Sequence, residues 1–353
     1  MELLTLEFDC LEVTAISIPE QKLTDDLFEI EKQLDKDAEQ ISPEPVSYWT
    51  DSWKRLKKNK GAVIGLILIT VIIFLALAGP FMNSHGFDEQ NLQLSNLPPK
   101  VPVLEHVSYL GLDGHTISGE DAYEVKNVDG YYWFGTDNLG RDIWTRVWQG
   151  TQISLYIAFL AALLDLLIGV AYGSISAYYG GKVDNVMQRI IEVLIGIPNL
   201  IVIILLILIL QPGIVSITLA MVITGWVNMA RIIRGQVLKL KGQEFVLASR
   251  TLGAGDGRLI WRHLIPNSIG PIIITTMFTI PSAIFTEAFL SFIGLGLQPP
   301  IASLGTIVND GFDLIQIYPH MLIFSSIIIS LIMISFNLLG DGLRDAFDPK
   351  MRR

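Results

Sequence analysis

Residues 61–81, GAVIGLILITVIIFLALAGPF, form an apolar run of 21 residues without a charged side chain. A helix of about 20 apolar residues spans the ~30 Å hydrocarbon core of a bilayer. A segment inside lipid must satisfy its own backbone hydrogen bonds, so we expect this run to be helical. The sequence therefore predicts an integral membrane protein whose fold is set by the bilayer.

Five further apolar runs follow in a chain that is 51% hydrophobic. The predicted spans after the first are residues 153–178, 190–210, 214–230, 269–290 and 318–339. Only Gln211-Pro212-Gly213 separates the third span from the fourth, and these turn residues favour a tight hairpin. We expect an all-α protein with six transmembrane helices.

Lys and Arg are distributed asymmetrically about these spans. They concentrate in residues 54–60 and 231–263, whereas the predicted outer loops, residues 211–213 and 291–317, contain none. Cytoplasmic loops carry the excess of basic residues in membrane proteins. The asymmetry predicts a multi-pass protein with both termini and residues 231–263 in the cytoplasm.

The formal net charge of −10 arises in one part of the chain, because residues 1–45 contain 13 acidic and 3 basic residues. We expect an acidic, flexible cytoplasmic tail there, with a short helix around residues 22–40. The expected organisation is a tail (1–48), a basic-aromatic lead-in with the first span (49–82), an extracytoplasmic segment (83–150) and a five-helix core (151–353).

The extracytoplasmic segment has structure of its own by pattern. Residues 121–126 and 131–134 are typical of a small β-hairpin, joined through Asp129-Gly130. Residues 142–150 place Ile143, Trp144, Val147 and Trp148 on one helical face, which predicts an amphipathic helix at the outer membrane interface. Asp137, Arg141 and Asp142 precede it and are expected to cap and pin it.

A second segment of interest, residues 242–267, lies on the cytoplasmic side. Its pattern predicts a helix over residues 244–252, a break at Gly253, Gly255 and Gly257, and a second helix from Arg258 that Pro266 ends. Two readings remain open from the pattern alone. The pair of helices inserts into the cleft of a soluble partner, or it rests on lipid as an amphipathic element.

This segment resembles the EAA loop of ABC importer permeases. Ala248-Ser249 and Gly253 stand at the Ala-Ala and Gly positions, and Ile265-Pro266 at the Leu-Pro position, with departures at Leu247 and His263. Three further stretches, FGTDNLGRD (134–142), EAFLSFIGLGLQPP (287–300) and GDGLRDAFDP (340–349), resemble signatures of the C-type permeases of oligopeptide, dipeptide and nickel ABC importers. The resemblance covers residues 49–353.

The resemblance implies the type I ABC importer permease fold, with a cytoplasmic coupling helix and an extracytoplasmic insertion. It implies a subunit of the bacterial cytoplasmic membrane that forms the pathway for peptides. Its implied partners are a homologous B-type permease, two cytoplasmic ATPases and an extracytoplasmic peptide-binding protein. The implied coupling residues are Glu244, Phe245, Ala248, Ser249, Arg250, Leu252, Gly253, Arg258 and Pro266. Contact with the binding protein becomes an alternative role for Asp137, Arg141 and Asp142.

We expect no catalytic, ATP or metal site in this chain. Gly181-Lys182 is the nearest approach to a P-loop, but Val183 stands where a Ser or Thr is required. The five His residues are scattered, and Cys10 is the only cysteine. ATP and Mg would therefore be bound by the partner ATPases.

Two acidic residues fall inside predicted spans, where a charge costs roughly 2.5–3.5 kcal/mol on insertion scales. Glu287 is interpreted as lining the pathway or a subunit interface, with an internal hydrogen bond as the alternative. Asp165 is interpreted as a buried group satisfied by a neighbouring helix or water. Gly169 and Gly173 form a small-xxx-small pair that predicts close helix packing.

Two other functions are compatible with part of the sequence pattern. A permease for nickel or a metal chelate would leave specificity to its binding protein, so this chain need carry no ligand cluster. A membrane enzyme or a non-transporting scaffold would need a catalytic constellation or lack the coupling segment.

Overall fold

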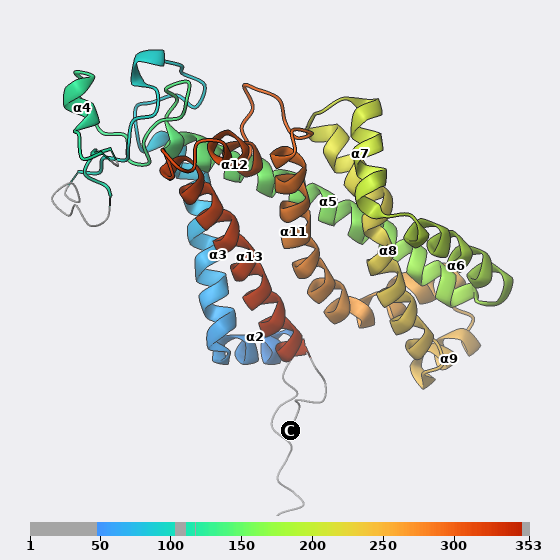
Figure 1. Ribbon diagram of the computed structural model, residues 1–353. Coiled ribbons are helices and arrows are strands. Elements are labelled where there is room, and N and C mark those ends of the chain that lie inside the picture. The colour runs from blue at the N-terminus through green and yellow to red at the C-terminus, as the bar shows by residue number, and fades with distance from the viewer. Residues whose placement is uncertain (1–47, 103–110, 117, 348–353) are drawn as a thin grey trace, which may run out of the picture. The chain divides into compact units, whose positions relative to one another are not determined.

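The computed structural model describes residues 48–102, 111–116 and 118–347, and the acidic tail with its expected helix lies outside them. The elements are α2 (Tyr48–Lys58), α3 (Lys60–Ala78), η2 (Gly79–Phe81), η3 (Leu92–Leu94), α4 (Ala122–Val125), α5 (Ile143–Tyr179), α6 (Gly181–Gly196), α7 (Asn199–Leu210), α8 (Ile214–Leu240), α9 (Glu244–Thr251), α10 (Asp256–Leu259), the π-helix η5 (Ile260–Leu264), η6 (Pro266–Ser268), α11 (Ile269–Phe292), α12 (Leu304–Phe312) and α13 (His320–Phe347) (Figure 1). Among these residues, β-structure is limited to isolated bridges.

The all-α fold class is confirmed. Within the described residues, five helices are long and apolar enough to span a membrane, namely α3, α5, α8, α11 and α13, and α6 with α7 makes a sixth span if that bent pair is counted as one. The third predicted span is therefore wrong as a single straight helix, because its two parts are bent by 81°. The cause is Pro198: the residue before a proline is pushed out of the helical region, and Ile197 has φ −98° and ψ 128°.

The prediction of a separate interfacial helix at residues 142–150 is also wrong. Asp142 caps the N-terminus of α5 by accepting a hydrogen bond of 2.8 Å from the backbone N–H of Thr145, and the helix then runs unbroken through 37 residues. Ile143, Val147 and Trp148 are buried within the protein. The apolar face predicted to lie on lipid instead packs on neighbouring elements of the same chain.

The expected β-hairpin is wrong as well. The carboxylate of Asp121 accepts from the backbone N–H groups of Tyr123 and Glu124, which caps the short helix α4 over the first predicted strand. Asp at an N-cap satisfies helix donors that would otherwise lack partners. The local capping preference of Asp121 therefore overrides the alternation of apolar residues that follows it.

The spanning helices approach closely where glycines line their contacts. A Cβ at Gly169 would lie 2.6 Å from Cβ of Met229, and one at Gly173 would overlap the carbonyl oxygen of Ala230. The predicted small-residue packing is thus found between α5 and α8. On the other side of α5, α3 packs along α13 through Gly65, where a Cβ would lie 2.7 Å from the carbonyl oxygen of Ser335.

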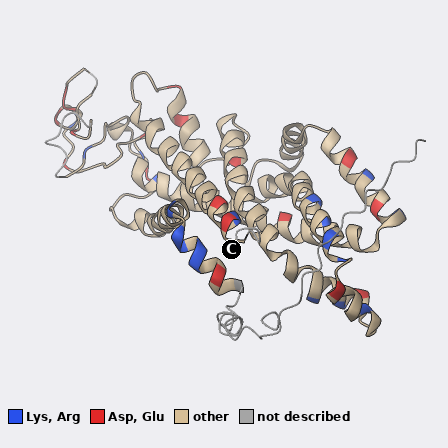
Figure 2. Cartoon of the chain, turned by 90° about the horizontal axis from the view of Figure 1, so that it is seen from below, with Lys and Arg blue, Asp and Glu red and all other residues tan. Residues whose placement is uncertain are grey.

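Charge is concentrated at one end of the helices. Viewed from below, Lys and Arg gather on α2 and around α8 and α9, while the spanning helices are mostly uncharged (Figure 2). In Figure 1, α2 and α9 lie at the bottom and α4 lies at the top. The two basic elements predicted to share one face of the membrane therefore lie at the same end of the helices.

Candidate functional site

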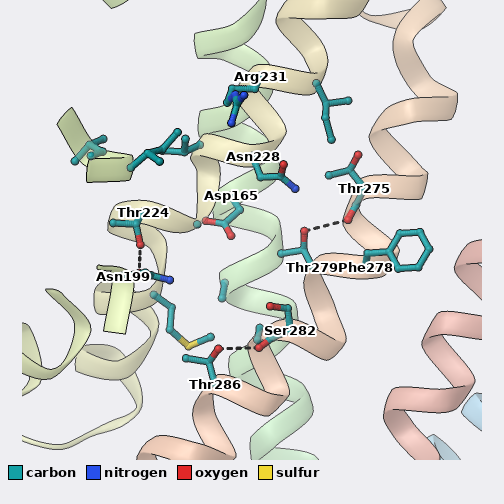
Figure 3. A pocket seen from close by; sticks show the side chains of 18 of the residues that line it. Asp165, Asn199, Thr224, Asn228, Arg231, Thr275, Phe278, Thr279, Ser282 and Thr286 are labelled. Atoms are coloured by element: carbon teal, nitrogen blue, oxygen red, sulfur yellow. Dashed lines mark hydrogen bonds between the residues drawn. The ribbon is translucent and has the colours of Figure 1, made fainter. Parts of the chain in front are cut away.

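A cavity of about 920 Å³ lies between α5, α6, α7, α8 and α11 (Figure 3), and Arg344 of α13 also lines it. Its polar lining residues are Asp165, Asn199, Thr224, Asn228, Arg231, Gln236, Thr275, Thr279, Ser282, Thr286 and Arg344. The remaining lining is largely aliphatic. A polar-lined cavity among membrane-spanning helices can hold water and a polar solute.

Two polar stripes form opposite walls of this cavity. Thr275, Thr279, Ser282 and Thr286 come from α11, and Thr224, Asn228 and Arg231 come from α8 (Figure 3). Residues spaced by three or four positions share one face of a helix. Neither stripe was among the sites predicted from the sequence, although hydroxyl residues at helical spacing within an apolar run were a visible signal.

The hydroxyl groups on α11 are partly satisfied by their own helix. Thr279 donates to the carbonyl oxygen of Thr275 at 3.0 Å, and Thr286 donates to that of Ser282 at 2.8 Å. Thr224 of α8 donates to the side-chain oxygen of Asn199, the first residue of α7. A hydroxyl that donates its proton keeps acceptor lone pairs, so this wall offers acceptors to a solute's N–H groups.

Asp165 lies on the cavity wall at the middle of α5. Its side chain is only 6% exposed, and Oδ1 has no hydrogen-bond partner among the described residues. The carboxylate lies directly against Gly225, where a Cβ would lie 2.7 Å from Oδ1. The expected hydrogen bond from a neighbouring helix is therefore not made to this oxygen within the described chain.

Glu287 lies inside the protein and not on the cavity wall. It is fully buried, and its two oxygens accept hydrogen bonds of 2.8 Å from Ser154 and Ser291. Ser303 donates in turn to Ser291 at 3.3 Å. The geometry matches the alternative of an internal hydrogen bond, since the neighbouring Thr286 lines the cavity and Glu287 does not.

Asp137, Arg141 and Asp142 are all buried in this chain. Their contact with a binding protein stays a prediction. Arg141 donates to Asp137 at 2.7 Å and to Asp310 at 3.3 Å. Arg146, which was not among the residues singled out in the sequence, also pairs with Asp137 and lies 3.1 Å from Asp310. Asp137, Arg141 and Arg146 therefore fasten the start of α5 to Asp310 of α12.

Asp142 sits just outside the span, and burial raises the pKa of its carboxyl above the ordinary value. Hydrogen bonds from Thr145 and Asn83 favour the ionised form and oppose this shift. Asn83 donates at 2.6 Å from the segment that follows α3. The cap thus joins the first span to the second.

The predicted coupling segment is held by buried anchors. Val246, Leu259 and Leu264 are enclosed in an apolar cluster with residues of α5, α8 and α11. Asp256 accepts a hydrogen bond of 2.6 Å from the hydroxyl of Tyr178, the penultimate residue of α5. Arg250 donates to the same hydroxyl at 3.1 Å and lies over the ring. Two short helices are therefore fixed to the end of α5.

The opposite face of this segment is exposed and apolar. Leu252 is 88% exposed and Trp261 is 69% exposed, and Phe245 also lies on the surface. Glu244, Ala248 and Arg258 are exposed, and Ser249 is half-buried. Isolated exposed apolar residues are ordinary, but several on one protruding segment are typical of an interaction site.

Two details of the segment's backbone bear on the predictions. Gly253 has φ +84°, and a Cβ there would meet nothing within 4 Å in this chain. Pro266 does not end a helix as expected. It opens the 3-10 turn η6, which leads directly into α11, so residues Asp256–Phe292 form one continuous helical stretch.

Comparison with known proteins bears on the motifs. Residues 169–353 match the family described as "Binding-protein-dependent transport system inner membrane component", and residues 47–99 match "N-terminal TM domain of oligopeptide transport permease C". These matches support the resemblance inferred from the sequence motifs.

Curated relatives match over nearly the whole chain. The dipeptide transport system permease protein DppC of Bacillus subtilis (strain 168) is 44% identical over 338 residues, covering 95% of this chain and 97% of the relative. The oligopeptide transport system permease protein OppC of the same organism is 44% identical over 333 residues, covering 94% and 100%. OppC of Escherichia coli (strain K12) is 34% identical over 319 residues, covering 90% and 97%.

Proposed function

Because this chain belongs to the inner-membrane permeases of binding-protein-dependent ABC importers, and among them to the permease C proteins of oligopeptide and dipeptide systems, we propose that it forms part of the pathway by which short peptides enter the cell. The observation that carries the proposal is the 44% identity to dipeptide and oligopeptide permeases over nearly the full length of both chains. The chain itself is the membrane-embedded subunit.

The cavity supports this role. Peptides carry backbone N–H and C=O groups that must be hydrogen-bonded or hydrated when they leave water. The hydroxyl stripe of α11 and the amide of Asn228 offer donors and acceptors along a space of about 920 Å³. Aliphatic residues fill the rest of the wall, which suits side chains of varied size.

The exposed face of the coupling segment supports a docking role on the cytoplasmic side. Leu252, Phe245 and Trp261 present apolar surface, while Val246 and Leu259 hold the segment to the spans. We infer that this face enters a groove on a cytoplasmic ATPase. ATP and Mg would be bound there, and their hydrolysis would drive the permease.

The remaining proposals concern the assembly and its orientation. The chain would pair with a homologous B-type permease, with two ATPases and with an extracytoplasmic peptide-binding protein. The basic elements α2 and α9 would lie on the cytoplasmic side of the bacterial cell membrane, because cytoplasmic segments carry the excess of Lys and Arg (Figure 2). Both termini would lie on the same side.

Reconstitution tests the function. The complete transporter in proteoliposomes, supplied with its binding protein and with ATP inside, is expected to accumulate radiolabelled trialanine. Omitting either ATP or the binding protein should abolish accumulation. The same vesicles are offered a nickel–histidine chelate, and ATP-dependent uptake of the chelate without uptake of peptide would refute the peptide assignment.

A further inference from the structure

Asp165 is an acidic side chain that the described fold encloses without a counter-charge. It is 94% buried, Oδ1 accepts no hydrogen bond from the described residues, and no ion pair of the described chain includes it. Buried polar groups in membrane proteins are normally paired, because an unsatisfied one costs free energy. A carboxyl group kept in this condition needs a function that compensates for its cost.

Asp165 fits beside the cavity because the neighbouring residue of α8 is a glycine. The carboxylate lies over Gly225 of α8, where any side chain would overlap it. In Figure 3, Asp165 faces the same space as Thr224 and Asn228, and Asn228 lies between it and Arg231. The group is therefore covered by protein on most sides and adjoins the cavity.

Asp165 of α5 and Arg231 of α8 lie at different heights along the cavity, because Asp165 packs beside Gly225 of α8. Arg231 comes six positions after Gly225, which corresponds to about 9 Å along a helix. No ion pair within 4 Å joins Arg231 to Asp165 in the described chain. An extended chain advances about 3.3–3.6 Å per residue, so a short peptide with its ammonium group at Asp165 would bring its carboxylate near Arg231.

We propose that Asp165, with Thr224 and Asn228, forms a subsite for the cationic α-ammonium group of the transported peptide. An ammonium group has three donors and no acceptor, which complements a carboxylate, a hydroxyl oxygen and an amide oxygen. Charge-assisted hydrogen bonds of this kind are about twice as strong as neutral ones. The inference rests on the proposed function and adds the orientation of the solute.

The test measures equilibrium binding to the complete transporter in nanodiscs without ATP or binding protein, so that the binding protein's own specificity cannot contribute. The probes are trialanine and N-acetyl-trialanine, which differ in the α-ammonium group. We expect the wild type to bind trialanine about tenfold more tightly, the range expected for one charge-assisted hydrogen bond. Asp165→Asn should bind both peptides alike.

Two further variants sharpen the comparison. Gly225→Ala should reduce the preference, because its Cβ displaces the carboxylate. Ser174→Ala is the matched control, since Ser174 is another buried polar residue of α5 without a hydrogen-bond partner in the described chain, and it does not line the cavity. We expect Ser174→Ala to keep the full preference.

The proposal is overturned if the wild type binds the two peptides equally or binds neither, or if Asp165→Asn keeps the preference. It is also overturned if Asp165→Asn disrupts assembly on size-exclusion chromatography, because that result would assign the carboxylate to a structural or subunit contact. ATP-driven uptake of trialanine by the wild type is measured in parallel. Intact uptake with no preference in binding would remove the subsite and leave the proposed function standing.

Discussion

Ser154 of α5 donates a hydrogen bond of 2.8 Å to Oε2 of Glu287 on α11, although the two residues are 133 positions apart in the chain. The backbone N–H of Leu304, at the start of α12, donates to the same serine oxygen at 3.3 Å. Glu287 therefore belongs to a closed polar network that joins α5, α11 and α12. Substitution of Glu287 is therefore expected to change the stability of the protein first.

We predict that Glu287→Leu lowers the thermal stability of the transporter, because the hydroxyls of Ser154 and Ser291 would lose their acceptor. A buried polar group left without a partner costs about 1–3 kcal/mol. Glu287→Gln, which keeps one carbonyl oxygen, should be much milder. Thr286→Val, on the adjoining cavity wall, is the contrasting variant and should change transport more than stability. If Glu287→Leu has normal stability but loses uptake, the interpretation that Glu287 lines the pathway is supported instead.

Gly253→Val is expected to uncouple transport from ATP hydrolysis. A β-branched residue at φ +84° is strained by about 1–2 kcal/mol, and the spans are untouched. We expect normal membrane abundance, weaker co-purification with the ATPases and loss of peptide uptake. Gly257→Val adds the same side chain in open space at a position without positive φ, and should be tolerated better. Undiminished association and uptake in Gly253→Val would mean that the segment only rests on lipid.

Asp137→Asn is expected to destabilise the N-terminal end of α5. The carboxylate pairs with both Arg141 and Arg146, whose side chains are nearly enclosed. Breaking a buried ion pair by removing one partner costs about 3–5 kcal/mol. Pulse proteolysis or thermal scanning of the purified complex would measure the loss. Glu124→Ala, at an exposed position of the same segment, serves as the control. If stability is unchanged but docking of the binding protein is weakened, a role of Asp137 in contacting the binding protein is supported instead.

The orientation of the chain is testable by cysteine labelling in a Cys10→Ser background. Glu120→Cys and Thr251→Cys both lie at exposed positions. A membrane-impermeant maleimide added to intact cells should label Glu120→Cys and should reach Thr251→Cys only in inverted vesicles. The reverse pattern would refute the topology inferred from the Lys and Arg asymmetry.

Deletion of residues 2–46 should leave peptide uptake within a few-fold of wild type. The deleted part precedes the match to the N-terminal domain of permease C, which begins at residue 47, and it carries most of the chain's excess negative charge. Uptake and membrane abundance are measured together. Loss of uptake at normal abundance would show that the tail has a docking or regulatory role.

Apolar length was enough to place the spanning helices, because a bilayer imposes one requirement on every crossing segment. It could not locate the ends that extend beyond lipid, so α8 reaches Leu240 where the prediction stopped at residue 230. The prediction from apolar length also took no account of Pro198, whose effect on the backbone of Ile197 divides the third span. That error was avoidable, since the proline was visible in the sequence.

Other parts of the site depend on pairings that a single sequence does not contain. The apolar face at Trp148 could have met lipid or protein, and only the fold shows that it packs on Gly79, where a Cβ would lie 2.5 Å from the indole. Glu287 was predicted to line the pathway or a subunit interface, with an internal hydrogen bond as the alternative, and the sequence could not show that its partner Ser154 lies on another helix. Asp165 shows the same limit, because its proximity to Gly225 follows from the crossing of α5 and α8.

The unbroken course of α5 has a mechanical consequence. Its first residues are tied to Asp137 and Asp310 through Arg146, and Tyr178 at its other end is tied to Asp256 and Arg250. A helix of 37 residues is about 55 Å long. A rigid rod of that length, tilted by about 5° around its midpoint, carries each end through roughly 2.4 Å. If the proposed orientation holds, a push by an ATPase near Tyr178 would move the other end of α5, on the receptor side, in the opposite direction.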